Sequence, residues 1–442
     1  MTTIDQRLRR HRAAGPAVGL RAGALYGPAT FGVTSAAVVL PNLIADLNTR
    51  PGAAVWVLSA YALTLGVATA VAGRIADAFG IAAVIGIGTV LLTAGTICCL
   101  LSTGLPPLII GRVAVAAGSG AVAASALTLT GNVPPAERGQ AVAGLGTVVA
   151  GCAATATIAG ALLATAGVWR LGLVLPALSL AAVPACLAAA PKTYRRGRID
   201  VPGAGLLTVA AGGLLVLAQA YTMALPAIAV AVVAAATSAA VLLLARHTTR
   251  RPDGFVPRQL ITHPGFVRIC AIGGGVYGAL FAVMAGVPSL LAHEHGWSAL
   301  PIGSGLLPGA VAGTVLARVA ARRRDDGLPL VAAASGVFVL LTVQAAVVGG
   351  PVPAVAAATA GLAASAATQV VLTRWLAVNL PQHSRGSGVG LLMFAQFFAG
   401  AVGAAAVTAL GESLGAAALG ATSAIAAAAT LLAVFTHTKA NS

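Results

Sequence analysis

Charged side chains are scarce in this sequence. Only 8% of its 442 residues are Asp, Glu, Lys or Arg, while 58% are hydrophobic. A soluble domain carries about a quarter charged residues, so this composition excludes a water-soluble fold. Apolar runs of the roughly 20 residues that a membrane-spanning helix needs follow one another along nearly the whole chain. The sequence therefore predicts an all-α polytopic membrane protein with the lipid bilayer as its solvent.

Aromatic residues are also few, at 4% of the chain. The net charge of +16 would otherwise suggest nucleic acid as a partner. A nucleic-acid surface gathers basic residues on one face with aromatics between them, but here the basic residues lie between the apolar runs. We therefore expect no nucleic-acid partner.

Signatures of enzymes and nucleotide-driven pumps are missing as well. The chain has no G-x-x-x-x-G-K-[ST] phosphate loop, and no convergent set of acid, base and metal-binding groups suggests an enzyme or a cofactor. We interpret His293-Glu294-His295 as an exposed polar loop rather than a metal site. The cysteines lack the spacing of a zinc or redox motif and are expected to serve in packing; they are Cys98, Cys99, Cys152, Cys186 and Cys270.

Breaks between the apolar runs predict fourteen membrane spans. The expected spans are 22–44, 53–75, 82–103, 106–130, 138–165, 169–190, 201–220, 224–245, 265–292, 299–320, 328–348, 353–378, 387–410 and 413–436.

The distribution of basic residues supports an even number of spans. With the N-terminus inside, all of the 26 Lys and Arg residues fall on the cytoplasmic side except Arg50, Arg112 and Arg170, as the positive-inside rule requires. Both termini are then cytoplasmic. Because Arg greatly exceeds Lys and Ala, Gly and Val abound, we expect a GC-rich bacterial genome and hence a plasma-membrane location.

An internal repeat divides the chain. Asn132-Val133-Pro134 with Arg138-Gly139 recurs at the same spacing as Asn379-Leu380-Pro381 with Arg385-Gly386, and many transporters are built from such repeats. The repeat predicts two six-helix halves with a helix pair inserted between them. The expected organisation is a basic cytoplasmic tail (1–21), a first half (22–190), the inserted pair with its flanking loops (191–264), a second half (265–437) and a short tail (438–442).

The loop expected between the second and third spans carries a recognisable pattern, Gly73-Arg74-Ile75-Ala76-Asp77-Ala78-Phe79-Gly80. Glycines permit a tight turn, and the Asp77 carboxylate could cap a helix while pairing with Arg74. The pattern resembles the G-x-x-x-D-x-x-G signature of the major facilitator superfamily, in which this loop latches one conformation. The alternative interpretation is an ordinary basic turn.

A second motif of that superfamily, an intramembrane arginine followed by small residues, is matched by Arg112 with Gly118 and Gly120. A charge within a membrane helix is costly, so it normally faces a cavity or a partner; alternatively, Arg112 lies near enough to a helix end to extend to the interface. We expect Gly118 and Gly120 to permit close helix packing.

Further landmarks resemble the fourteen-helix drug:proton antiporter branch of the superfamily. They are the stretch 31–41, Trp56, Tyr61, residues 167–170 with Pro176, and residues 199–204. Two departures weaken this similarity. The first-helix Asp of the branch is Gly32 here, and of the fifth-helix glycine pattern associated with export only Gly151 and Gly160 remain, which we expect to pack against other helices.

None of the ten acidic residues lies clearly at the centre of a predicted span. The candidates for proton coupling are therefore Asp46 and Glu294 at the outer mouth and Asp77 at the inner latch. A cavity poor in acids and close to Arg112 disfavours cationic substrates, so we expect neutral or anionic amphipathic ones. The candidate cavity residues, each of which could instead serve in helix packing, are Thr34, Tyr61, Tyr277, Gln369, Met393 and Gln396.

These features together predict a monomeric secondary transporter. It would export a small hydrophobic or amphipathic compound, such as an antibiotic or secondary metabolite, by alternating access between the halves. Uptake, facilitated diffusion and a sensor that binds its ligand without transporting it remain as alternatives.

Overall fold

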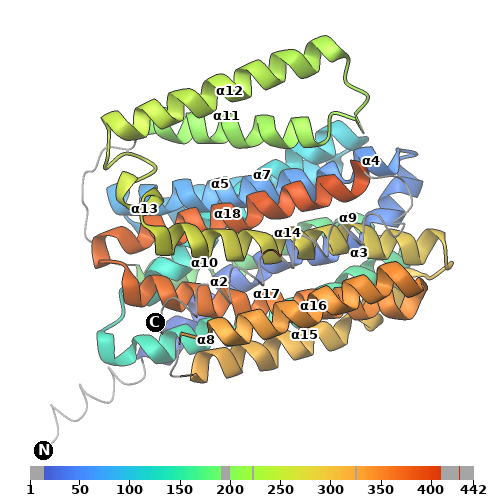
Figure 1. Cartoon of the computed structure of the whole chain (residues 1–442). Helices are drawn as coiled ribbons and strands as arrows, with labels where there is room; N and C mark the ends of the chain where they lie inside the picture. The colour runs from blue at the N-terminus through green and yellow to red at the C-terminus, as the bar shows by residue number, and fades with distance from the viewer. Residues whose placement is uncertain (1–13, 191–199, 222, 324–325, 410–427, 429–442) are drawn as a thin grey trace, which may run out of the picture.

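The computed structural model describes residues 14–190, 200–221, 223–323, 326–409 and 428. All regular secondary structure in these residues is helical (Figure 1). Thirteen helical stretches are long and apolar enough to cross a membrane, and each overlaps a predicted span. The predicted fourteenth span, 413–436, lies outside the described residues.

The first span is longer than predicted and is interrupted. It comprises α2 (Ala14–Tyr26), one turn of 3-10 helix, η1 (Gly27–Thr30), and α3 (Phe31–Asp46). Residues 14–21, which were predicted to belong to the basic tail, are therefore helical. The helix is held by packing: a Cβ atom at Gly19 would lie 2.2 Å from the Ala141 carbonyl oxygen, so α2 packs directly on the backbone of the neighbouring helix α8.

The rest of the first half supplies five more spans. Their elements are α4 (Pro51–Ala54) with α5 (Trp56–Phe79), α6 (Ile81–Leu101), α7 (Leu105–Gly131), α8 (Pro135–Thr165), and finally α9 (Trp169–Val174), η2 (Leu175–Ala182) and α10 (Val183–Ala189).

The inserted pair and the second half follow. The pair consists of α11 (Val201–Ala218) and α12 (Ala227–Arg250); the short α13 (Arg258–Ile261) leads into α14 (Pro264–His293), α15 (Ala299–Arg322), α16 (Leu328–Val348), α17 (Pro351–Asn379) and α18 (Gln382–Ala409).

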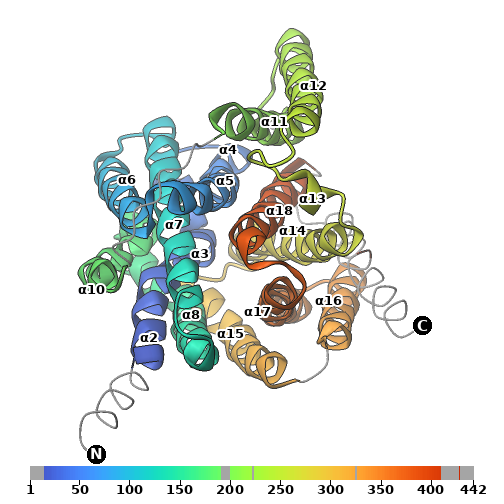
Figure 2. The same cartoon turned by 90° about the vertical axis from the view of Figure 1, so that its left-hand side faces the viewer.

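The two halves meet through equivalent helices. The second helix of the first half, α5, packs on the fifth of the second half, α18, and α15 packs on α8 in the reciprocal way. Figure 2 separates the two halves and shows α11 outside them, beside α5 and α18, with α12 packed on α11 further out. Such reciprocal contacts are what an approximate two-fold relation between the halves would produce; the division of the chain into these halves stays a prediction.

Glycines allow the helices of the first half to approach backbone to backbone. A Cβ atom at Gly95 of α6 would lie 2.5 Å from the Val115 nitrogen, and one at Gly118 of α7 would lie 2.6 Å from the Leu92 nitrogen. Such close approach maximises dispersion contacts, which drive helix association where the hydrophobic effect is absent.

The other glycines predicted to pack behave differently from one another. Gly120 faces α5, where a Cβ atom would lie 2.8 Å from the Leu65 carbonyl oxygen, and Gly160 faces α3, where it would lie 2.9 Å from the Ser35 carbonyl oxygen. Gly151 is exposed, and a Cβ atom there would meet no described atom within 4 Å. The packing role predicted for Gly151 therefore finds no partner in the described part of the chain.

Two alanine substitutions on the same helix test the close packing. Gly95→Ala should destabilise the protein by about 1–3 kcal/mol, the usual cost of overpacking. Gly86→Ala should be neutral or slightly stabilising, because a Cβ atom there meets nothing within 4 Å and alanine favours a helix by about 1 kcal/mol over glycine. Thermal unfolding of the two purified variants in detergent measures the difference; equal melting temperatures would refute the packing interpretation.

Candidate functional site

Arg112 lies in the interior of the first half. Its side chain has no exposed surface, so the alternative that it extends to the membrane interface is wrong. The guanidinium donates hydrogen bonds from Nε to the Val57 carbonyl oxygen at 3.3 Å and from Nη1 to the Leu173 carbonyl oxygen at 2.7 Å. A third bond runs from Nη2 to the Gly32 carbonyl oxygen. Arg112 on α7 thus joins α3, α5 and α9.

Tyr61 covers the face of this guanidinium. The Arg112 Cζ atom stands 4.1 Å from the centre of the Tyr61 ring, and the Tyr61 hydroxyl donates to the Ala29 carbonyl oxygen at 3.2 Å. A cation over an aromatic face gains roughly 0.5–2 kcal/mol, more where water is excluded. Tyr61, predicted to line the substrate cavity, is fully buried beside Arg112.

The ring of Tyr61 also explains the glycine at position 32. A Cβ atom at Gly32 would lie 2.1 Å from the Tyr61 ring carbon Cζ. No larger side chain fits there while Tyr61 keeps its position, so an aspartate cannot occupy this site. Carbonyl dipoles and a π face stabilise the buried cation, and hydrogen bonds to a charged group each contribute roughly 1.5–3 kcal/mol.

The candidate residues of the second half come together. The Tyr277 hydroxyl donates to Gln369 Oε1 at 3.1 Å, and Gln369 Nε2 donates to the Thr373 hydroxyl at 3.2 Å and approaches Met393 Sδ at 3.9 Å. These residues come from α14, α17 and α18. Thr373 was not predicted, although its position one helical turn after Gln369 places it on the same face.

Aromatic rings extend this group. The ring centres of Tyr277 and Phe281 lie 6.3 Å apart, and Phe397 lies 5.9 Å from Tyr277 and 6.1 Å from Phe281. We call these three rings with Gln369, Met393 and Gln396 the Tyr277 cluster. The sequence signal that was overlooked is the spacing of Tyr277 and Phe281, which share one face of a helix.

The Tyr277 cluster borders the first half. A Cβ atom at Gly66 of α5 would lie 3.1 Å from Phe397 Cβ, and Tyr26 at the end of α2 packs against the same buried core as Tyr277. Thr34, the remaining candidate from the first half, is half-buried and donates to the carbonyl oxygen of Thr30, the last residue of η1. The cluster therefore lies where the two halves meet.

Gln396 has an unusual environment within this cluster. It is fully buried, and neither atom of its amide has a hydrogen-bond partner in the described part of the chain. It lies over Gly273, where a Cβ atom would be 3.0 Å from Gln396 Nε2. A buried amide without partners is costly and calls for an explanation such as a water molecule, a ligand or another conformation.

The three acids predicted for proton coupling lie in different surroundings. Asp46 Oδ2 accepts hydrogen bonds from Trp169 Nε1 and from Arg170 Nη1, both at 3.2 Å, and the Asp46 side chain is 49% exposed. Glu294 is exposed directly after the end of α14. The backbone of Asp77 lies in the last turn of α5, and its side chain lies outside the described residues. Asp46 and Glu294 are thus far from the interior of the bundle.

The signature segment, residues 73–80, is not the loop that was predicted. Helix α5 continues to Phe79, and only Gly80 separates it from α6. Gly80 has a φ of 86°, a conformation that glycine adopts without strain. Gly73 lies within the helix rather than in a turn, and a Cβ atom there would make an ordinary van der Waals contact, 3.6 Å from the Gly386 carbonyl oxygen of α18.

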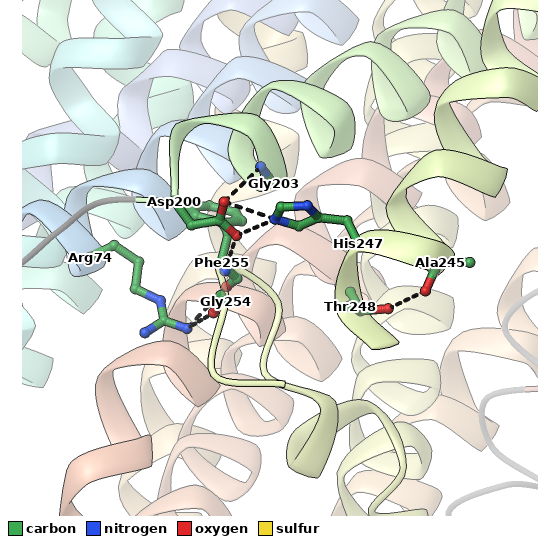
Figure 3. A network of polar contacts seen from close by, with 8 residues as sticks. All are labelled: Arg74, Asp200, Gly203, Ala245, His247, Thr248, Gly254 and Phe255. Atoms are coloured by element: carbon green, nitrogen blue, oxygen red, sulfur yellow. Dashed lines mark hydrogen bonds and ion pairs between the residues drawn. The ribbon is translucent and has the colours of Figure 1, made fainter. Parts of the chain in front are cut away.

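Arg74 of this segment contacts the loop that follows the inserted pair. Its Nη2 donates to the carbonyl oxygens of Gly254 and Phe255, the latter at 3.2 Å (Figure 3). This partner was not predicted from sequence, because residues about 180 positions apart meet only through the tertiary fold.

Asp200 binds the same loop through the Phe255 N–H. Partial burial opposes ionisation of its carboxyl group, but its hydrogen bonds with Phe255, His247 and Gly203 outweigh burial and lower its pKa. The carboxylate is therefore ionised at neutral pH. Its contribution to stability is complete above the pKa of the unfolded chain and is lost as the pH falls through the lower folded value.

No group of three or more His, Cys, Asp or Glu residues among the described ones could hold a metal ion. His293, Glu294 and His295 are exposed near the end of α14.

Comparisons with known proteins agree with this architecture. Residues 23–404 match the family model described as Major Facilitator Superfamily. The solved structure of the xylose transporter XylE from E. coli, in a partially occluded inward open conformation, superposes with a TM-score of 0.62 at 14% identity, covering 96% of this chain and 97% of that one. At that identity the likeness concerns the fold alone.

Two curated relatives are more similar in sequence. The puromycin resistance protein pur8 of Streptomyces alboniger is 28% identical over 327 residues, which cover 70% of this chain and 64% of that protein. The MFS-type transporter Rv1250 of Mycobacterium tuberculosis is 30% identical over 191 residues, covering 40% of this chain and 32% of that protein. The chain thus spans less than two thirds of the length of either relative.

The fit between Gly32, Tyr61 and Arg112 predicts a compensating pair of substitutions. Gly32→Asp should sharply lower the melting temperature, because the new side chain overlaps the Tyr61 ring, and Tyr61→Ala should cost about 3–5 kcal/mol by leaving a cavity. The double variant should be more stable than the sum of the two changes predicts, since the introduced carboxylate then has room to pair with Arg112. Thermal unfolding of the four proteins measures this coupling, and strict additivity would exclude the steric explanation.

Proposed function

Because the chain belongs to the major facilitator superfamily and is a membrane transporter rather than an enzyme, we propose that it exports a hydrophobic or amphipathic small molecule by alternating access of its two halves. The substrate would be a drug, an antibiotic or a secondary metabolite. The superfamily fold places the binding site between the halves, and the Tyr277 cluster lies at that position.

The chemistry of the Tyr277 cluster is the observation that carries this proposal. It combines the aromatic faces of Tyr277, Phe281 and Phe397 with the hydroxyl of Tyr277 and the amide of Gln369. Apolar walls with a few polar groups are typical of sites for small organic ligands. The hydrogen bonds and ring contacts given above for the cluster involve no acidic side chain, which favours a neutral or anionic substrate over a cation.

The unpaired amide of Gln396 extends the argument to the transport cycle. Motion between the halves alone leaves α14 and α18 together, so this amide would be exposed to water or to substrate by a rearrangement of α18 against α14 within the second half. Its donor and acceptor would then gain the partners that they lack in the described part of the chain. We therefore assign Gln396 to substrate contact in a more open state.

Export rather than uptake is supported by one relative in particular. The protein pur8 is named for resistance to puromycin. The thirteen candidate spans and the predicted span 413–436 would together give the fourteen helices of the drug:proton antiporter branch. In that arrangement both termini face the cytoplasm of a bacterial cell, and the protein works as a monomer in the plasma membrane.

Proton coupling is part of the same proposal. Asp46 binds Arg170 and Glu294 is exposed at a helix end, so neither occupies the interior position expected of a coupling carboxylate. Asp77 is the remaining predicted candidate. Collapse of the proton gradient tests this coupling directly.

A carrier for uptake or facilitated diffusion is the second candidate function. It is favoured by the absence of an acid at Gly32, where the Tyr61 ring fills the space, and by the exposure of Gly151. Flux measured in inside-out vesicles separates the two, because an exporter loads such vesicles when the gradient is imposed.

Antibiotic accumulation provides the first test. Cells that express the protein should accumulate several-fold less of at least one neutral or anionic amphipathic antibiotic than cells with an empty vector, and a protonophore should abolish the difference. Unchanged accumulation of puromycin and of a panel of neutral and anionic antibiotics would exclude export, while raised accumulation would identify an importer.

A pair of tyrosine variants tests the site itself. Tyr277→Phe removes the hydroxyl that donates to Gln369 and should reduce transport efficiency by up to about tenfold, the equivalent of one hydrogen bond of about 1.4 kcal/mol. Tyr221→Phe serves as the matched control, because Tyr221 is 84% exposed near the end of α11. Equal transport rates for the two variants would show that the Tyr277 cluster is not the substrate site.

A further inference from the structure

The inserted pair is attached to a single helix of the first half by polar contacts at both ends. At one end, Gln219 Nε2 donates to the Ser59 hydroxyl at 2.9 Å, and both side chains are buried. At the other end, Arg74 donates to the carbonyl oxygens of Gly254 and Phe255. Ser59 lies in the first turn of α5 and Arg74 near its end, so the two contacts span most of that helix.

One carboxylate organises the second of these contacts. Asp200 caps α11 by accepting from the Gly203 N–H at 3.2 Å, and it accepts from the Phe255 N–H at 2.8 Å. His247 Nε2, from the last turns of α12, lies 2.8 Å from both Asp200 oxygens. As Figure 3 shows, Asp200 joins both helices of the pair to the loop whose carbonyl groups face Arg74. A capping carboxylate with several donors holds its partners in one geometry.

The loop also carries apolar side chains that reach both halves. Phe255 and Val256 are 3% and 7% exposed and belong to a buried cluster with Ala70 of α5 and Leu391 and Leu392 of α18. The apolar contacts of the loop thus involve both halves, whereas the hydrogen bonds described above from its backbone to a half run to the first half, through Arg74. Apolar surfaces have no directional bonds to break when they slide past each other.

We propose that Asp200 is a positioning residue for transport: it holds the Gly254–Phe255 turn against Arg74, so that the inserted pair moves together with the first half. This inference rests on the proposed transport function. Through the contact of this turn with Arg74, the signature segment acts on the inserted pair. Helices α11 and α12 then travel with α5, while α18 moves relative to them.

The first experiment measures how accessible the Gly254–Phe255 turn is to a thiol reagent, and it does not require transport. Val256→Cys is introduced after the five native cysteines are replaced by alanine, and its reaction with a maleimide is followed in the purified full-length protein. Adding Asp200→Asn should raise the labelling rate at least about tenfold, because the turn loses the carboxylate that holds it and opens locally. Adding Asp253→Asn should leave the rate unchanged, since this exposed acid of the same loop lies outside the contacts of Asp200. Equal rates in all three proteins overturn the proposal.

The kinetics of the same variants separate positioning from substrate binding. Asp200→Asn should lower the maximal transport rate several-fold with little change in KM, because the Tyr277 cluster is untouched. His247→Gln, which keeps a side-chain donor, should retain more of the rate than His247→Ala. A change in KM without a change in maximal rate contradicts the proposed role. If labelling responds as expected but the wild-type protein moves no substrate, the proposed function fails and the role of Asp200 in holding the turn stands.

Cross-linking tests which half the pair accompanies. Ser59→Cys with Gln219→Cys, joined by a short bifunctional thiol reagent, should leave transport at least half as fast as without the reagent. Gly73→Cys with Gly386→Cys joins the two halves at the contact of α5 and α18 and should stop transport. Arrest by the first cross-link would show that the pair must leave α5 during the cycle, which overturns the proposal.

Discussion

A positive charge buried without an acidic partner is the constraint around which the described part of the first half is built. The Arg112 guanidinium donates hydrogen bonds to the carbonyl oxygens of Gly32, Val57 and Leu173, and it lies over the ring of Tyr61. The three carbonyl groups come from different helices, so the cation can be accommodated only when α3, α5, α7 and α9 are assembled. The cost of leaving a buried charge unpaired thus favours one packing of these helices over others. Helix α6 joins these four helices through its close approach to α7 at their glycines.

The spans could be predicted well because the bilayer imposes a simple rule on the sequence. In lipid, every backbone polar group must be bonded internally, so apolar runs of sufficient length become helices. The predictions were least accurate where tertiary contacts decide. Glycines at positions 73 and 19 were interpreted as turn or tail residues, yet both lie within helices, and Gly19 permits a neighbouring helix to approach its backbone. Gly151, interpreted as a packing residue from a family pattern, faces none of the described helices.

The candidate site, too, could be predicted from the sequence only where residue type was enough, and not where tertiary contacts decide. Tyr277, Gln369 and Met393 were identified by residue type alone, as polarisable or hydrogen-bonding groups in otherwise apolar helices, and the fold brings them together. Tyr61 met the same criterion but faces Arg112, because residue type does not reveal which side of a helix faces a partner. The contact of Arg74 with the Gly254–Phe255 turn joins segments remote in the sequence, and no local pattern could have indicated it.

The uncompensated charge of Arg112 also has an electrical consequence. A unit charge that crosses the full membrane voltage changes in energy by about 2.3 kcal/mol per 100 mV. Carbonyl groups and an aromatic ring stabilise the cation but leave its net charge unchanged. Any rotation of the first half that shifts Arg112 along the membrane normal therefore performs work against the field in proportion to that shift. The resting potential of the cell would then bias the orientation of the first half, whether or not the substrate itself carries a charge.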